Sequence, residues 1–163
     1  MDSEAAQAPI SPAEPPTGRF SGKLDDKGRL KFPVDFQTYL SSFADKGLFV
    51  TSIDRTTVQI YPKTTWRSNL KLLREQKDLQ DEVEVVLFNA QDLGADAEMD
   101  GQGRVMFNTD LRKELDLDGQ GVHFYVEGGH ILLFTEAIYQ QKRQESMART
   151  KSAVKLVKGA GLQ

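Results

Sequence analysis

An internal repeat constrains the fold of this chain more than any other feature of its sequence. Residues 25–40, DDKGRLKFPVDFQTYL, align without gaps on residues 100–115, DGQGRVMFNTDLRKEL, at an offset of 75. The identical pairs are Asp25/Asp100, Gly28/Gly103, Arg29/Arg104, Phe32/Phe107, Asp35/Asp110 and Leu40/Leu115. A chain that repeats this pattern should fold as two similar units.

The segments after each copy also correspond, because each copy leads to two runs rich in Val, Ile, Phe and Tyr. These runs are residues 48–53 and 57–61 in the first unit, and 122–126 and 131–134 in the second. Each unit is therefore predicted as strand, glycine turn, strand, short helix, strand, turn and strand. The paired glycines 128 and 129 suit a two-residue hairpin turn.

Helices are predicted after the strand pair of each unit, at residues 62–76 and 135–147. Residues 78–92 space their apolar side chains three and four apart, which favours a helix, although the valine-rich part also fits a strand. We divide the chain into four parts. They are a disordered leader (1–17), the first repeat (18–77), the second repeat (78–148) and a flexible basic tail (149–163).

Composition places the chain among ordinary globular proteins, with 39% apolar and 28% charged residues in 163 positions. Cysteine is absent, which excludes disulfides, thiolate metal sites and cysteine nucleophiles. The apolar runs are far shorter than the roughly 20 residues that cross a bilayer. We therefore expect a cytoplasmic protein without a membrane partner.

Charge is segregated along the chain, although the formal net charge is only −3. Residues 19–77 carry twelve basic and six acidic side chains, a balance of +6. Residues 78–135 carry three basic and thirteen acidic side chains, a balance of −10. Residues 136–163 carry six basic and two acidic side chains, a balance of +4. The basic first unit fits nucleic-acid binding, but on charge alone it fits equally well a solvated face with no partner.

Catalytic and cofactor motifs are not found in this sequence, so we expect neither an enzyme, a cofactor nor a small-molecule substrate. Its two histidines, His123 and His130, are read as ordinary strand residues. Asp96, Glu98 and Asp100 imitate the start of a calcium loop, but position twelve is a phenylalanine rather than the required glutamate.

Arg29 is the strongest candidate for contacting DNA. It follows Gly28, whose missing side chain allows an unusual turn, and its guanidinium can hold guanine or phosphate with two hydrogen bonds. Lys27 and Lys31 alternate in step with Arg29, so an extended strand would present all three cations on one face. We expect the lysines to contact phosphates while the arginine reads bases.

Both arginines also have a structural interpretation. Arg29 can pair with Asp25 and fix the turn, and the same carboxylate can orient the guanidinium toward DNA. For Arg104 the structural role is favoured more strongly, because its neighbours are Gln102 and Met106 and the surrounding block is acidic. We therefore expect the second copy to contribute less to DNA binding.

The repeated motif resembles that of the MraZ family, which is related to the AbrB-type swapped-hairpin proteins. The family pattern is Asp-x-x-Gly-Arg, an apolar residue and, two or three positions on, a proline that opens a helix. The first copy fits throughout, whereas the second has Asn108 in place of the proline. The resemblance covers about residues 18–148, including the Tyr61-Pro62 step and Trp66.

This resemblance implies an α+β, mainly β fold: a double-split β-barrel built from two tandem units with flanking helices. It also implies a ring-shaped homo-oligomer of about eight to twelve subunits that binds short direct repeats in double-stranded promoter DNA. Such a protein would be a nucleoid-associated repressor of its own division and cell-wall gene cluster. The DNA-binding residues implied are Asp25, Lys27, Gly28, Arg29, Lys31 and Arg104.

A second hypothesis is an oligomeric interaction or assembly protein that keeps the fold but has weakened DNA binding. The altered second motif and the net negative charge favour this alternative, whereas the basic first unit and its intact motif favour a DNA-binding regulator.

Overall fold

Both repeat units have the predicted order of elements in the computed structural model, which describes residues 12–163. The first unit contains β1 (Phe20–Lys23), β2 (Arg29–Lys31), α1 (Val34–Ser41), β3 (Leu48–Thr51) and β4 (Val58–Pro62). The second contains β5 (Ala95–Ala97), β6 (Arg104–Met106), α4 (Thr109–Leu115), β7 (Gly121–Glu127) and β8 (His130–Thr135). The repeat in the sequence is therefore also a repeat of elements.

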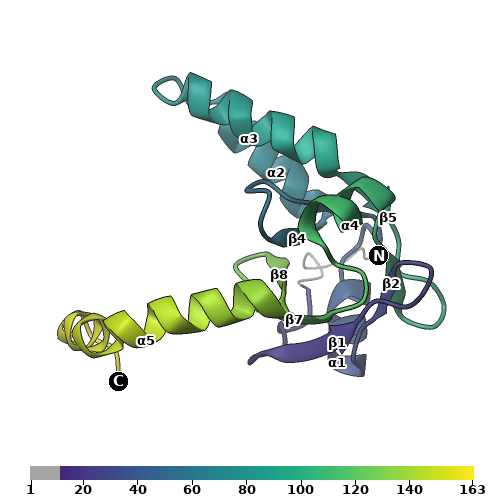
Figure 1. The fold of residues 1–163 in the computed structure, drawn as a ribbon. Helices are drawn as coiled ribbons and strands as arrows, with labels where there is room; N and C mark the ends of the chain where they lie inside the picture. Colours follow the sequence, from purple (N-terminus) through teal and green to yellow (C-terminus); the bar gives the residue numbers. More distant parts are fainter. Residues whose placement is uncertain (1–11) are drawn as a thin grey trace, which may run out of the picture.

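Three further helices leave the sheets, namely α2 (Lys63–Arg74), α3 (Gln80–Leu93) and α5 (Glu136–Gly159). The helical interpretation of residues 78–92 is confirmed over the strand alternative. Helix α5 continues well beyond its predicted end at residue 147, because no proline or glycine interrupts the sequence before Gly159. Most of the expected flexible tail is thus helical. Figure 1 shows the α2–α3 hairpin and α5 projecting in different directions.

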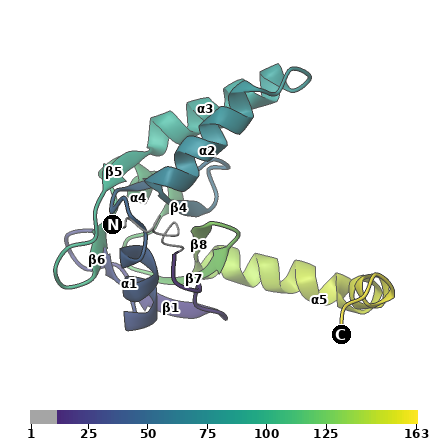
Figure 2. The ribbon, with the colours of Figure 1, turned by 180° about the vertical axis from the view of Figure 1, so that it is seen from behind.

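The main sheet exchanges strands between the two units. Its order is β1-β7-β8-β4-β3-β5, and every neighbouring pair is antiparallel. The first strand of each unit thus pairs with a strand of the other unit, and β4 and β8 meet at the centre. The remaining strands, β2 and β6, form a separate two-stranded sheet. Figure 2 shows the molecule from behind, with β6 of the small sheet and β7 and β8 of the large sheet labelled.

The fold is α+β, as predicted, but the expectation that it is mainly β is wrong. Helices contain more residues than strands, because the α2–α3 hairpin and the long α5 are added to short strands. The hydrogen-bonded strand order describes two open sheets, with β1 and β5 at the edges of the larger one.

A cluster of phenylalanines fills the space between the two sheets. Phe32 and Phe36 are buried, and their rings lie 5.4 and 5.1 Å from the ring of Phe124 on β7. Leu30 and Val105 point into the same core from the small sheet. This shared core fixes the small sheet on the large one.

The beginning of the chain is only partly described. Residues 1–11 of the predicted leader lie outside the described residues, whereas the backbone N–H of Ala13 donates a hydrogen bond to Ser42 Oγ at 2.7 Å. Across residues 12–163, no helix combines the length and the apolar character that spanning a bilayer requires.

The core assignment can be tested with two leucines of contrasting burial. Leu133 is fully buried in β8, whereas Leu72 on α2 is 56% exposed. We expect Leu133→Ala to lower the free energy of unfolding by about 2–5 kcal/mol, because it removes buried methyl groups and leaves a cavity. Leu72→Ala should change it by less than about 0.5 kcal/mol. Urea denaturation of both variants measures this, and equal effects would contradict the packing.

Candidate functional site

The two motif copies meet in one antiparallel ribbon, because β2 pairs with β6. In its register Leu30 lies opposite Val105, and Lys31 lies opposite Arg104. Arg29 lies opposite Met106. Residues 75 positions apart in the sequence are therefore neighbours in space, and the candidate site is a single surface.

The ribbon has one apolar and one cationic face. Leu30 and Val105 are buried, with exposed fractions of 1% and 0%. Because successive side chains of a strand point to opposite faces, Arg29, Lys31 and Arg104 share the other face. Two cations directly opposite each other repel unless a counter-charge or an anionic ligand is near. Asp100 supplies such a counter-charge to Arg104, whereas Lys31 is exposed and suited to an anionic ligand.

An aspartate fixes each arginine in the same geometry. Asp25 Oδ2 lies 2.8 Å from Arg29 Nε, and Asp25 Oδ1 accepts the backbone N–H of Arg29 at 2.9 Å. In the second copy Asp100 makes the same two contacts with Arg104, at 2.8 and 2.9 Å. The proposed Asp25–Arg29 ion pair is confirmed, and the second copy repeats it.

These contacts leave the far end of each guanidinium free. Within residues 12–163, hydrogen bonds engage Nε of Arg29 and Arg104 but neither terminal nitrogen. The aspartate therefore orients the side chain without using the pair of donors that binds a base or phosphate. The geometry shows no difference between the copies that corresponds to the expected weaker role of Arg104.

Hydrogen bonds keep the two carboxylates ionised. The backbone N–H of Arg29, above all, lowers the pKa of Asp25. The corresponding N–H of Arg104 lowers the pKa of Asp100 from 3.8 to about 2. Since both groups are charged at neutral pH, the arginine clamps persist across the physiological range.

Each turn depends on glycine and is held by the other copy. Gly28 and Gly103 have backbone φ angles of +82° and +78°, which residues other than glycine rarely adopt. The Gly28 carbonyl accepts the N–H of Phe107, and the Gly103 carbonyl accepts that of Phe32, both at 2.9 Å. A Cβ on Gly28 would lie 2.5 Å from Arg112 Nε, so any other residue would also displace the Arg112 side chain.

Lys27 departs from the expected arrangement. It lies in the turn before β2, not on the extended strand with Arg29 and Lys31, so the three cations do not share one strand face. The physical reason is that Asp25 Oδ1 also accepts the N–H of Lys27, at 3.0 Å, which folds the chain into a turn. Lys27 is exposed there, beside the ribbon.

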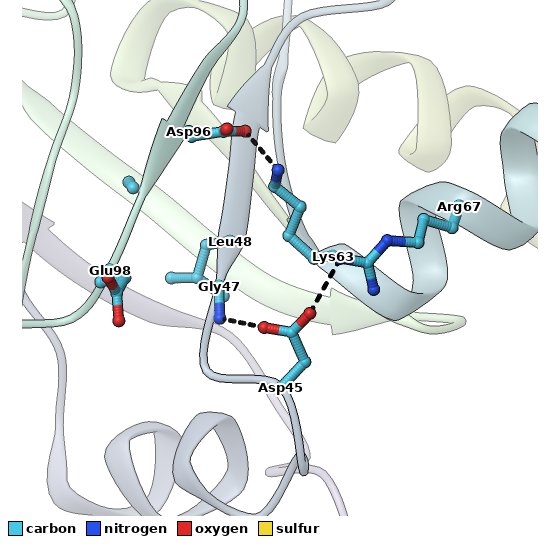
Figure 3. Close-up of a pocket in the computed structure, with 8 residues that line it drawn as sticks. Asp45, Gly47, Leu48, Lys63, Arg67, Asp96 and Glu98 are labelled. Carbon is cyan, nitrogen blue, oxygen red and sulfur yellow. Dashed lines mark hydrogen bonds and ion pairs between the residues drawn. The ribbon is translucent and has the colours of Figure 1, made fainter.

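A polar pocket of about 440 Å³ is another candidate site. It lies where α2 meets β3 and β5, as Figure 3 shows. Both cations of the pocket are in ion pairs: Lys63 Nζ lies 2.9 Å from Asp96, and Arg67 lies 3.0 Å from Asp45. These ion pairs join α2 to β5 and to the loop before β3, so both cations that line the pocket already have a carboxylate partner.

The histidines lie in strands, as expected, His123 in β7 and His130 in β8. His123 is held between Glu136 and Arg19, each at 2.7 Å, and burial lowers the pKa of His130. In the part of the chain that the structure describes, no three His, Asp or Glu side chains are grouped to hold a metal ion.

Comparison with known proteins finds relatives over most of the chain. The protein is 31% identical over 107 residues to the "Transcriptional regulator MraZ" of Acidobacterium capsulatum. The aligned region covers 66% of this chain and 73% of the relative. Relatives of the same name are 32% identical in Koribacter versatilis (63% and 71%) and 31% identical in Cupriavidus pinatubonensis (77% and 86%). No model of a protein family matches the chain.

The relatives define a class, that of transcriptional regulators, and their names describe no enzyme. The paired motif copies on the small ribbon agree with this class. With 31% identity over 73% of one relative, the chain belongs to the MraZ family.

The clamp can be tested by titrating Asp100. Because the hydrogen bond from Arg104 stabilises the carboxylate, we expect its pKa at about 2, below the ordinary 3.8. The stability that this carboxylate contributes is then present above pH 3.8 and is lost as the pH falls through about 2. Side-chain carbon NMR shifts report the midpoint. A midpoint at 3.8 would show that the clamp does not form.

Proposed function

We propose that the chain is a sequence-specific DNA-binding transcriptional regulator, and that the β2–β6 ribbon contacts the DNA. The observation that carries the proposal is the placement of two aspartate-oriented arginines on one face of the ribbon. Membership in a family of transcriptional regulators supports it independently.

The chemistry of the ribbon fits a DNA groove. The major groove is about 12 Å wide and admits a two-stranded β-ribbon. An arginine held at Nε keeps its terminal nitrogens in a fixed plane, which matches guanine O6 and N7 or two phosphate oxygens. Lys27 and Lys31 then neutralise phosphates on the first-copy side of the ribbon.

Arg104 joins Arg29 in this proposal. Its contacts with Asp100 repeat those between Asp25 and Arg29 to within 0.1 Å, and its strand lies directly beside β2. The acidic charge that argued against it in the sequence is spread over other elements, including α3, which projects from the sheets (Figure 1). Linear charge counts therefore understate the basic character of the ribbon.

The proposal also includes the barrel, the subunit ring and the type of DNA site that the family resemblance implies. We propose that the two sheets form a double-split β-barrel, and that about eight to twelve subunits form a ring. The ring would bind short direct repeats in the promoter of a division and cell-wall gene cluster and repress it, on the nucleoid. The motif resemblance supports each of these features.

The second candidate is an oligomeric assembly protein with weakened DNA binding. Its supporting observation is the loss of two cations from the second copy, where Gln102 and Met106 replace the equivalents of Lys27 and Lys31. The two candidates differ in whether the arginines determine binding to the protein's own promoter.

Truncating the two arginines tests the proposed site. We expect Arg29→Ala and Arg104→Ala each to cost roughly 1–3 kcal/mol per site and to relax specificity, because each removes a pair of donors to a base. Electrophoretic mobility shifts with the upstream promoter and with random DNA measure both effects. Arg67→Ala, which breaks the remote pair with Asp45, is the matched control and should bind like the wild type.

The outcomes separate the alternatives. Loss of binding in Arg29→Ala alone would show that the second copy is structural. Unchanged binding in both variants, or no promoter preference in the wild type, would favour the assembly protein.

Lys27 tests the phosphate contacts separately. We expect Lys27→Ala to weaken specific and random DNA about equally, and to lower the slope of log affinity against log salt by about one unit. The reason is that a phosphate contact releases a counterion but reads no base. Binding titrations across a salt series measure the slope, with Lys71→Ala on α2 as the control. A selective loss of promoter binding would contradict this role.

A further inference from the structure

Helix α5 is long and has no residue buried in this chain. Its 24 residues extend about 36 Å. Among residues 12–163, its ring contacts with the sheet lie in the first two turns, where Tyr139 stacks on His123 at 4.1 Å and Lys142 Nζ lies 5.5 Å from the centre of the Phe134 ring. Helices without tertiary packing are marginally stable in water. Helix α5 therefore has an unused surface over most of its length.

One face of α5 alternates cations and apolar side chains. The spacing of Arg143, Met147, Lys151, Val154 and Lys158 places these five residues on one stripe of the helix, here called the basic stripe. Met147 is 61% exposed and Val154 is 40% exposed. Exposed apolar groups flanked by charges are typical of a docking surface with an opposite charge on its partner.

Helix α3 carries the complementary surface. The spacing of Asp81, Glu84, Val85, Phe88 and Asp92 places them on one face, here called the acidic stripe. Val85 and Phe88 are 61% and 64% exposed. Helix α3 contains no lysine or arginine, whereas α5 has six of them and only two acids. Arg55 lies against one end of the stripe, 2.8 Å from Asp92 and 5.9 Å from the ring of Phe88, and it also pairs with Glu114. The charge of Asp92 is therefore matched within the chain, and the acids that face a partner are Asp81 and Glu84.

The two stripes do not meet within one chain. Helices α3 and α5 diverge from the sheets, and their far ends are well separated in Figures 1 and 2. Two different, complementary surfaces on one molecule make a head-to-tail contact between copies, which closes into a ring when the rotation allows it.

We propose that the basic stripe of α5 docks on the acidic stripe of α3 in a second copy of this chain. Met147 and Val154 then cover Val85 and Phe88, while the lysines of the basic stripe face Asp81 and Glu84. The inference rests on the oligomeric part of the proposed function and names the surfaces that form the oligomer. It does not involve the ribbon.

Charge reversal tests this docking in the full-length protein. We expect Lys151→Glu with Lys158→Glu, and separately Asp81→Lys with Glu84→Lys, to weaken assembly at least about tenfold, because each places like charges across the interface. Combining all four substitutions should restore assembly, since the attraction is then re-formed with exchanged signs. Sedimentation velocity at micromolar concentration measures the mass, and circular dichroism checks the helices.

The matched control reverses two charges of α5 that lie off the basic stripe, Arg149→Glu with Lys155→Glu. This variant should assemble like the wild type, and so should Arg29→Ala, which alters only the ribbon. Added salt should shift the wild type toward the 18.3 kDa monomer, because it screens the exposed charges.

The outcomes distinguish two kinds of failure. A monomeric wild type would contradict the oligomer of the proposed function together with the docking. A wild-type oligomer that both reversals leave intact would overturn the docking alone. If the α5 reversal weakens binding to random DNA and leaves assembly unchanged, the basic stripe contacts nucleic acid and the docking is wrong.

Discussion

The structure depends on hydrogen bonds that each motif copy makes to the other. The carbonyls of Gly28 and Gly103 accept the N–H groups of Phe107 and Phe32, and these bonds hold β2 and β6 in register. The register directs Leu30 and the phenylalanines into the core and leaves the arginines outside. Neither copy can form the ribbon alone, because each copy supplies one of its two strands. A two-stranded sheet is also stable only when it packs against other elements.

This dependence explains why the two copies keep the same polar details. In both turns an aspartate carboxylate accepts backbone N–H groups and holds the arginine Nε, so one interaction shapes the turn and aims the guanidinium. A structural role and a binding role are therefore compatible in the same residue. The differences between the copies lie at Lys27 and Lys31, whose counterparts Gln102 and Met106 carry no charge, and they give the ribbon a more basic half.

The helices outside the sheets carry the proposed docking surfaces, away from the ribbon that is proposed to contact DNA. The α2–α3 hairpin and α5 are inserted after the strand pairs, where they do not disturb the ribbon or the central sheet. Acidic and basic residues are divided between α3 and α5, so the net charge of −3 describes neither surface. The proposed DNA-binding face and the proposed assembly face are compatible in one small chain, because opposite charges are kept on different elements.

The sequence by itself determined the repeat, the order of elements in each unit, the tight β7–β8 turn and the two glycine turns of the motif. Local signals suffice for these features, since periodicity, glycine positions and motif spacing act over a few residues. Only the tertiary structure decided that the first strands are exchanged between units, that β2 pairs with β6, and that Arg104 lies opposite Lys31. It also placed Lys27 in the turn and extended α5 to Gly159. Pairing between residues 75 positions apart depends on a shared core and on hydrogen bonds across the copies, which no local pattern encodes.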